Sequence, residues 1–287
     1  MTADATAGRV EPWTRHLFWV LRIAAAMCFI GHGAFGIITK PSWLVYLGVV
    51  GIGRELGFVL MPVIGVVDIL LGLSMLIRPT KAALAYMTLW AMWTALLRPL
   101  AGQGFSETLE RGGNYGVPFA LLVIGLAAFP RGNWFGEIVP PPTDVALTRR
   151  LAWILRLTTG VLLLGHGLLA AMGKPLMIQH LATLGVGDGA AATRTAVAAQ
   201  GGFEIALALA VLAAPGWPLL LIVLVWKIAT ELVFPLTGDY IWEFVERGGS
   251  YGAPLALMIL VRSAAAVGPS TTGTRLLQVQ AEALQGE

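Results

Sequence analysis

Charged residues are scarce in this chain, and their scarcity decides the class of protein. Only 12% of the 287 residues are Asp, Glu, Lys or Arg, whereas 57% are hydrophobic. A soluble domain carries about 25% charged residues, so this chain cannot cover a water-facing surface. Its apolar runs approach the roughly 20 residues that a helix needs to span a bilayer. The composition therefore predicts an all-α integral membrane protein, with the lipid bilayer as its surroundings.

Two further absences exclude classes of function. The chain has a single cysteine, Cys28, so a dithiol relay or a disulfide within the chain is excluded. The net charge is only +3, and no basic stripe follows the path of a phosphate backbone, so no nucleic-acid partner is expected. The first apolar run is too long for the core of a cleaved signal peptide, and we expect it to stay as the first spanning helix.

Eight apolar segments are expected to cross the membrane as helices. The fourth and the eighth are short for a span and must extend into their flanks. The segments cover residues 17–38, 58–77, 82–97, 117–129, 153–172, 196–214, 219–234 and 253–261.

The chain contains a tandem repeat. The phrase ERGGNYGVP at residues 110–118 returns as ERGGSYGAP at 246–254, with seven of nine residues identical. Charged residues inside apolar segments are matched as well, since Asp68 corresponds to Glu204. The repeat predicts two four-helix units, at residues 15–129 and 150–262, joined by a Pro-rich linker at 130–149. An N-terminal tail at 1–14 and a polar C-terminal tail at 263–287 flank them.

The number of spans per unit sets the expected symmetry. Because four is even, both units should enter the membrane in the same direction, related by a pseudo-two-fold axis along the membrane normal. Lys and Arg are slightly more frequent on the side of the termini and the linker, nine against seven. This bias predicts a multi-pass protein of the cell inner (cytoplasmic) membrane with both termini in the cytoplasm. The loops before the fourth and eighth spans are then expected on the outer side.

Matched polar residues within the spans are candidates for function. Placing a carboxylate near the bilayer centre costs free energy, so such a residue suggests a function and requires a pairing partner. The histidine and the lysine of the same unit are the candidate partners, either to fix the packing or to form a functional pair. The second unit adds a lysine and a glutamate four residues apart, which can pair on one helix face. The predicted intramembrane polar pocket consists of His32, Asp68, His166, Glu204, Lys227 and Glu231.

A second group is expected on the outer side. In the repeated phrase, Glu-Arg forms a charge pair, and Gly-Gly permits a positive φ or a close backbone approach. Pro118 and Pro254 suit the first turn of the following helix. The predicted outer rim of the pocket is Lys40, Glu107, Glu110, Arg111, Lys174, Glu243, Glu246 and Arg247, while Arg22 and Arg156 lie in the inner halves of the first helices.

Haem ligation is an alternative use of the matched histidines. The pseudo-symmetry could bring His32 and His166 together as two axial ligands. A histidine that donates a hydrogen bond to a neighbouring carboxylate is the commoner arrangement. We therefore rank haem below a carboxylate partner and expect no metal ligands.

The segments LRIAAAMCFIGHGAFGIITKP and LRLTTGVLLLGHGLLAAMGKP resemble the first helix of DoxX-like membrane proteins, with Arg, then Gly-His-Gly, then Lys. The whole of residues 15–262 resembles two such four-helix units fused. The resemblance implies a membrane subunit of a redox system, such as the small subunit of a thiosulfate:quinone oxidoreductase, with a quinone and a partner protein on the outer side. The residues it carries over are Arg22, His32, Lys40, Arg156, His166 and Lys174.

Three functions stay open at this point. The chain is a quinone-binding or non-catalytic redox subunit, a small-solute or proton-coupled transporter, or a structural subunit of a membrane complex. No motif shows catalysis, and an oligomer is compatible with all three. We rank the redox subunit first on the resemblance.

Overall fold

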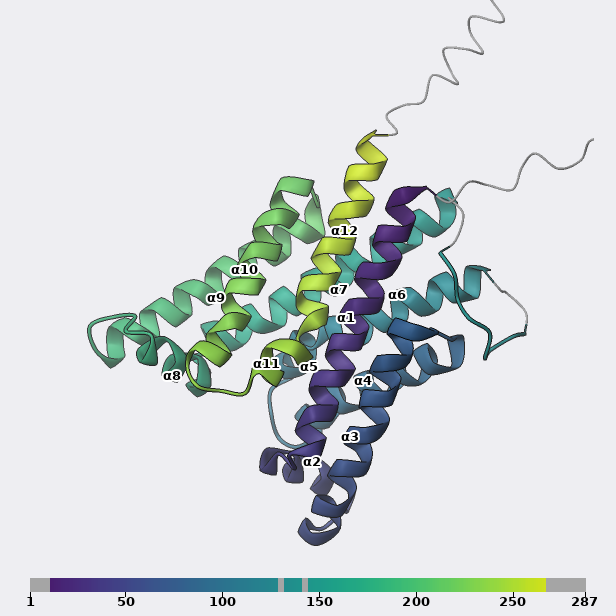
Figure 1. The fold of residues 1–287 in the computed structure, drawn as a ribbon. Helices are drawn as coiled ribbons and strands as arrows, with labels where there is room; N and C mark the ends of the chain where they lie inside the picture. Colours follow the sequence, from purple (N-terminus) through teal and green to yellow (C-terminus); the bar gives the residue numbers. More distant parts are fainter. Residues whose placement is uncertain (1–10, 129–131, 141–143, 267–287) are drawn as a thin grey trace, which may run out of the picture.

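The computed structural model describes residues 11–128, 132–140 and 144–266 (Figure 1). Across these residues the chain is helical, and its extended backbone is limited to one bridge between Thr80 and Glu137. The long helices are α1 (Pro12–Ile37), α3 (Arg54–Ile77), α4 (Lys81–Leu100), α6 (Gly112–Ala128), α7 (Val145–Ala171), α9 (Ala190–Ala213), α10 (Trp217–Leu236) and α12 (Gly248–Ala266). The short ones are η1 (Pro41–Trp43), α2 (Leu44–Val49), α5 (Ser106–Glu110), α8 (Pro175–Thr183) and α11 (Ile241–Glu246).

Each of the eight predicted segments falls on one long helix, to within a residue at its ends. Phe129, the predicted end of the fourth segment, lies outside the described residues. Five helices, α1, α3, α7, α9 and α10, are long and apolar enough to cross a membrane. The prediction of an all-helical chain with membrane-crossing helices is confirmed at this level.

The starts of α6 and α12 differ from the prediction. Both helices begin at the first glycine of the repeated phrase, five residues before the predicted segments, at Gly112 and Gly248. Pro118 and Pro254 therefore lie inside the helices, and the expectation that they occupy the first turn was wrong. Gly-Gly has a low helix propensity, and here tertiary packing overrides that propensity.

The predicted linker and C-terminal tail are shorter than expected. Helix α7 begins at Val145, within the predicted linker, because Asp144 caps it by accepting hydrogen bonds from the backbone N–H groups of Ala146 and Leu147. Helix α12 continues to Ala266, and the remainder of the tail lies outside the described residues.

Four helices form the centre of the molecule (Figure 1). Helix α1 packs on α12, α7 packs on α6, and α6 and α12 contact each other. The first helix of each unit therefore lies against the last helix of the other unit. Leu21, Leu121, Leu155 and Leu257, one from each of these helices, belong to a single buried apolar core.

The other four long helices surround this centre. Helix α3 packs on α1, α9 on α7, α4 on α6 and α10 on α12. Their outward faces are apolar, as on α3, where Val59, Val63, Val66 and Leu70 form an exposed stripe. A large apolar face is costly in water and is expected in contact with lipid.

The glycines of the repeated phrase allow helices to approach closely. Gly113 and Gly249 lie backbone to backbone where α6 meets α12, and a Cβ on Gly113 would lie 2.5 Å from the carbonyl carbon of Gly249. Gly112 contacts Leu162 on α7, and Gly248 contacts Met27 on α1. None of the four has a positive φ. Close packing, and not turn geometry, therefore requires glycine here.

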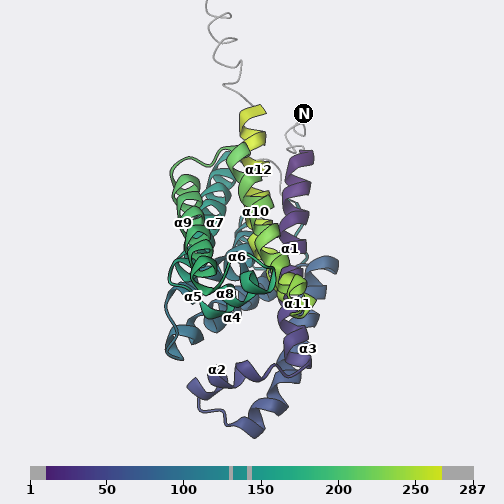
Figure 2. The same cartoon turned by 90° about the vertical axis from the view of Figure 1, so that its left-hand side faces the viewer.

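Figure 2 shows the start of α1 and the end of α12 at the same end of the molecule. The short helices α2, α5, α8 and α11 lie toward the other end in both views (Figures 1 and 2). The residues of the predicted outer rim are carried by these short helices and the loops beside them.

Replacing Gly113 with leucine should destabilise the protein by at least about 1–3 kcal/mol, because the side chain would force α6 away from α12. Gly202→Ala on α9 is the matched control, since a Cβ there meets nothing within 4 Å. Thermal unfolding in detergent measures both. A Gly113→Leu protein that unfolds at the parent temperature contradicts the packing argument.

Candidate functional site

Arg22 and Arg156 cap helix ends. Arg22 donates from Nε to the carbonyl of Met75 at 2.5 Å and from a terminal nitrogen to that of Leu76 at 2.6 Å. Arg156 donates from one terminal nitrogen to the carbonyls of both Leu212 and Ala213. The last carbonyls of a helix have no partner within it, and a cation there also opposes the helix dipole. The two arginines therefore hold the ends of α3 and α9.

The glycines of each Gly-His-Gly serve two neighbouring elements. Gly31 lies against the backbone of Glu246, and Gly33 lies against Gly65 on α3. In the second unit, Gly165 and Gly167 make the equivalent contacts with Glu110 and Gly201. The histidine is thus held between the second helix of its own unit and the Glu-Arg phrase of the other.

The histidine of each unit pairs with the carboxylate of the same unit. His32 donates from Nδ1 to Asp68 at 2.7 Å, and His166 donates from Nδ1 to Glu204. The histidine, and not the lysine, is therefore the partner of each buried carboxylate. Both ring Nδ1 atoms are used in this way, and the described part of the chain holds no cluster of three or more His, Cys, Asp or Glu side chains that could bind a metal ion.

One methylene group makes the two pairs different. In the second unit the indole N–H of Trp226 donates to Glu204 at 2.7 Å. In the first unit the matched Trp90 N–H is buried and has no partner among the described residues, and the same holds for the second oxygen of Asp68. Aspartate is shorter than glutamate by one methylene, so its carboxylate reaches less far toward α4.

The rim lysines pair across the two units. Lys40 donates to Glu243 of the second unit, and Lys174 lies 3.0 Å from Glu107 of the first unit and 3.8 Å from Glu110. The arginines of the repeated phrase join the same network. Arg111 lies 3.0 Å from Glu110 and 3.4 Å from Glu107, and Arg247 lies 2.6 Å from Glu243. The predicted rim residues are therefore assembled by contacts between the units.

The second unit has two further charged residues in this network. Lys227 and Glu231 pair at 2.7 Å on α10, as the four-residue spacing predicts. The other carboxylate oxygen of Glu231 lies 2.9 Å from Nε of Arg247. The first unit has Ala91 and Ala95 at the matched positions.

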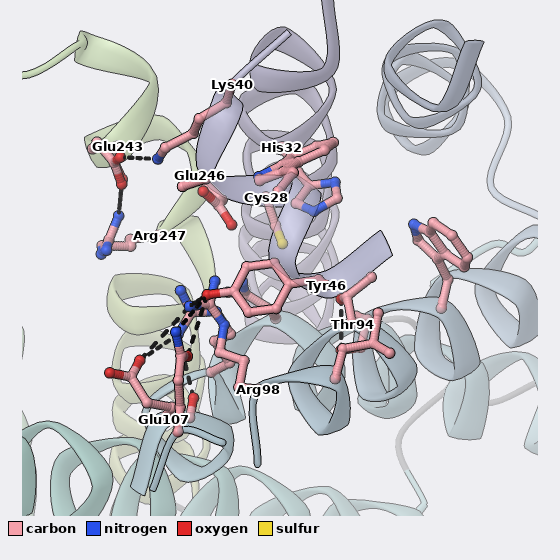
Figure 3. A pocket seen from close by; sticks show the side chains of 18 of the residues that line it. Cys28, His32, Lys40, Tyr46, Thr94, Arg98, Glu107, Glu243, Glu246 and Arg247 are labelled. Atoms are coloured by element: carbon pink, nitrogen blue, oxygen red, sulfur yellow. Dashed lines mark hydrogen bonds and ion pairs between the residues drawn. The ribbon is translucent and has the colours of Figure 1, made fainter. Parts of the chain in front are cut away.

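A cavity of about 260 Å³ lies where the two units meet (Figure 3). On one wall the His32 ring stacks on Trp43 with the ring centroids 4.5 Å apart. Tyr46 and Trp90 add further ring surface, and Cys28 lies on α1 beside His32. The predicted residues that line the cavity are His32, Lys40, Glu107, Arg111, Lys174, Glu243, Glu246 and Arg247. Both units thus contribute side chains to this cavity.

The remaining predicted residues lie around the cavity. Asp68 stands behind His32, which it holds by the hydrogen bond described above. His166 and Glu110 border a separate space of about 40 Å³. Glu204, Lys227 and Glu231 are fully buried in the second unit.

The equivalent space in the second unit is the one of about 40 Å³ beside His166 and Glu110, and it is much smaller than the cavity. Arg98, which donates to the Tyr46 hydroxyl at 2.7 Å, corresponds to Phe234. Tyr46 itself corresponds to His180, whose ring meets that of Phe234 edge-on at 4.8 Å and whose Nε2 bonds Asp239 at 2.8 Å. The sequence reasoning missed Trp43, Tyr46 and Arg98. The signal was their divergence between the two units.

Two rim carboxylates, Glu243 and Glu110, are held in their charged form. Burial opposes the charge of Glu243, but Arg247 and Lys40 outweigh burial and lower its pKa to about 2. Burial also opposes the charge of Glu110, but Lys174 and Arg111 outweigh it and lower its pKa well below the usual value. These two carboxylates therefore stay charged at neutral pH.

Comparisons of the chain with family models, with curated proteins and with solved structures return no match. The resemblance to DoxX-like proteins thus depends on the Arg, Gly-His-Gly and Lys pattern alone. The structure accounts for each residue of that pattern by a contact, through Arg22, Gly31, His32, Gly33 and Lys40.

The stability of the protein should depend on pH through Glu243. Because its pKa is lower in the folded protein, its contribution is complete above about pH 4.5 and is lost as the pH falls toward 2. Thermal unfolding measured between pH 5 and pH 2 should show a shallower loss for Glu243→Gln than for the parent. Glu55→Gln, on an exposed residue of α3, serves as control and should follow the parent. Identical profiles for all three proteins contradict the prediction.

The two matched tryptophans should differ in their contribution to stability. Trp226→Phe removes a hydrogen bond to a carboxylate and should cost about 1.5–3 kcal/mol. Trp90→Phe removes an N–H without a partner and should cost less than about 0.5 kcal/mol. Chemical unfolding of the two variants in one detergent measures the difference, and equal losses contradict the assigned hydrogen bonds.

Proposed function

We propose that this chain is a DoxX-like protein of the cell inner membrane whose shared cavity binds the head ring of a quinone for a redox system. All eight long helices cross the membrane, as two units about a pseudo-two-fold axis along the normal. The matched packing supports this symmetry, since α1 on α12 has its counterpart in α7 on α6, and α1 on α3 in α7 on α9. The contact of Gly113 with Gly249 marks the axis.

The observation that carries the proposal is the composition of the cavity wall. Flat aromatic side chains, with His32 stacked on Trp43, suit a flat ring. Polar groups at the cavity suit the ring oxygens of a quinone. A volume of about 260 Å³ holds one substituted ring and is too small for a haem macrocycle.

The residues of the chain have distinct roles in this proposal. A bound quinone would carry two electrons and two protons. His32 binds a ring oxygen, and Asp68 fixes the orientation of His32 by accepting its Nδ1–H. Trp43 and Trp90 hold the plane of the ring.

The proposal places the redox partner on the side of the short helices. The Glu-Arg phrases lie there, and each is preceded by a glutamate, Glu107 or Glu243, that pairs with the lysine of the opposite unit. A partner protein on that side, which we assign as the outer side, would exchange electrons with the bound ring. The chain itself then acts as the quinone-binding membrane subunit, with the chemistry of the second substrate supplied by the partner.

The purified protein in detergent should bind a short-chain benzoquinone in at least one of its oxidation states, measured by isothermal calorimetry. His32→Ala should weaken the binding of the more tightly bound oxidation state by about tenfold, equivalent to about 1.4 kcal/mol. His166→Ala is the matched control, because this histidine has the same hydrogen bond to a carboxylate but does not line the cavity. Its affinity should stay within about twofold of the parent.

Two results overturn the proposed function. One is the absence of binding in both oxidation states by folded parent protein. The other is an equal loss of affinity in the two histidine variants, which would place the ring elsewhere. Each variant is first compared with the parent by thermal unfolding.

A further inference from the structure

Glu246 differs from the other carboxylates of the cavity. Glu107 and Glu243 each pair with two or more basic side chains. Glu246 is only 9% exposed, and no basic group among the described residues lies within ion-pair distance of it. Figure 3 shows its carboxylate in the cavity beside Cys28, with no interaction drawn to it.

The absence of a partner follows from the extra charges of the second unit. The counterpart of Glu246 in the first unit, Glu110, pairs with Arg111 at 3.0 Å. Arg247, the residue equivalent to Arg111, is instead held by Glu231 at 2.9 Å and Glu243 at 2.6 Å. Because the first unit has an alanine in place of Glu231, nothing there competes for Arg111 in this way.

His32 presents a second hydrogen-bond acceptor to the cavity. Its Nδ1–H donates to Asp68, so the neutral ring has an acceptor at Nε2. The side chain is 20% exposed on the cavity wall. With His32 in its neutral form, the cavity thus has two acceptors without a donor among the described residues, Glu246 and His32.

Two donors of the cavity residues are buried away from the cavity surface. The Trp90 N–H and the Nε–H of Arg98 are unpartnered among the described residues but have almost no accessible surface. A quinone carbonyl only accepts hydrogen bonds and leaves the Glu246 carboxylate unpaired. A hydroquinone hydroxyl also donates, so it can satisfy Glu246.

We propose that the cavity selects the hydroquinone form of its ligand over the quinone form, with Glu246 accepting a hydrogen bond from one phenolic hydroxyl. The inference rests on the proposed function, since it names the oxidation state that the same cavity prefers. Glu231 acts as a positioning residue, because it draws Arg247 away and leaves Glu246 free for the ligand.

Calorimetry with the reduced and oxidised forms of one short-chain benzoquinone, under anaerobic conditions, tests the preference. The parent should bind the hydroquinone at least about tenfold more tightly than the quinone, since an unpaired buried carboxylate in the quinone complex is costly. Glu246→Gln should reduce this ratio to within about twofold. Glu55→Gln, on an exposed residue of α3 that has no contact with this network, is the control and should keep the ratio of the parent.

A second variant tests the mechanism with Glu246 in place. Lys227→Ala with Glu231→Ala gives the second unit the two alanines of the first. Arg247 is then free to pair with Glu246, as Arg111 pairs with Glu110. The preference for the hydroquinone should fall below about threefold. If Glu246→Gln does not fold, the double variant still tests whether an unpaired Glu246 causes the preference for the hydroquinone.

The outcomes separate the inference from the proposed function. Equal affinity for both forms, or a preference for the quinone, overturns the inference while the proposed function stands. Tighter binding of a ring of the same size that has an ammonium group also overturns it. Binding of neither form overturns both. A preference that persists in the folded double variant overturns the role of Glu231.

Discussion

The fold depends on the contact between the first helix of each unit and the Glu-Arg-Gly-Gly phrase of the other. Gly31 meets the backbone of Glu246, and Gly165 meets that of Glu110. The lysine after each first helix reaches across to a glutamate of the opposite unit. Neither unit therefore completes its own ion pairs. The cavity lies at this junction because the side chains that form it come from both units.

The duplication allows the two units to divide structural and functional roles. In the second unit, Glu204 satisfies Trp226, and Phe234 with His180 narrows the space equivalent to the cavity to about 40 Å³. In the first unit, Asp68 stops short of Trp90, and Arg98 with Tyr46 leaves a cavity of about 260 Å³. The symmetric contacts hold the molecule together, whereas the asymmetric residues account for the different sizes of the two spaces.

The sequence predicted the parts of this arrangement that depend on local pattern. Apolar runs placed the long helices, the repeat placed matched charges, and a four-residue spacing predicted the pair of Lys227 and Glu231. Contacts between units could not be predicted, because a repeat does not say whether Lys40 pairs within its unit or across to the other. The helical position of Pro118 was missed for a similar reason, since the contact of Gly113 with Gly249 decides where α6 begins.

Unpartnered polar groups in a buried site lower the stability of a protein, so their retention requires a compensating gain. Among the described residues, Asp68 and Trp90 have such atoms and Glu246 has no ion pair, while the matched Glu204, Trp226 and Glu110 are paired. The same backbone thus supports a paired and an unpaired version of these three positions. On the proposed function, a ligand that pairs with Glu246 would stabilise the folded state by binding it alone. The three matched positions of the second unit then serve as the reference for those of the first.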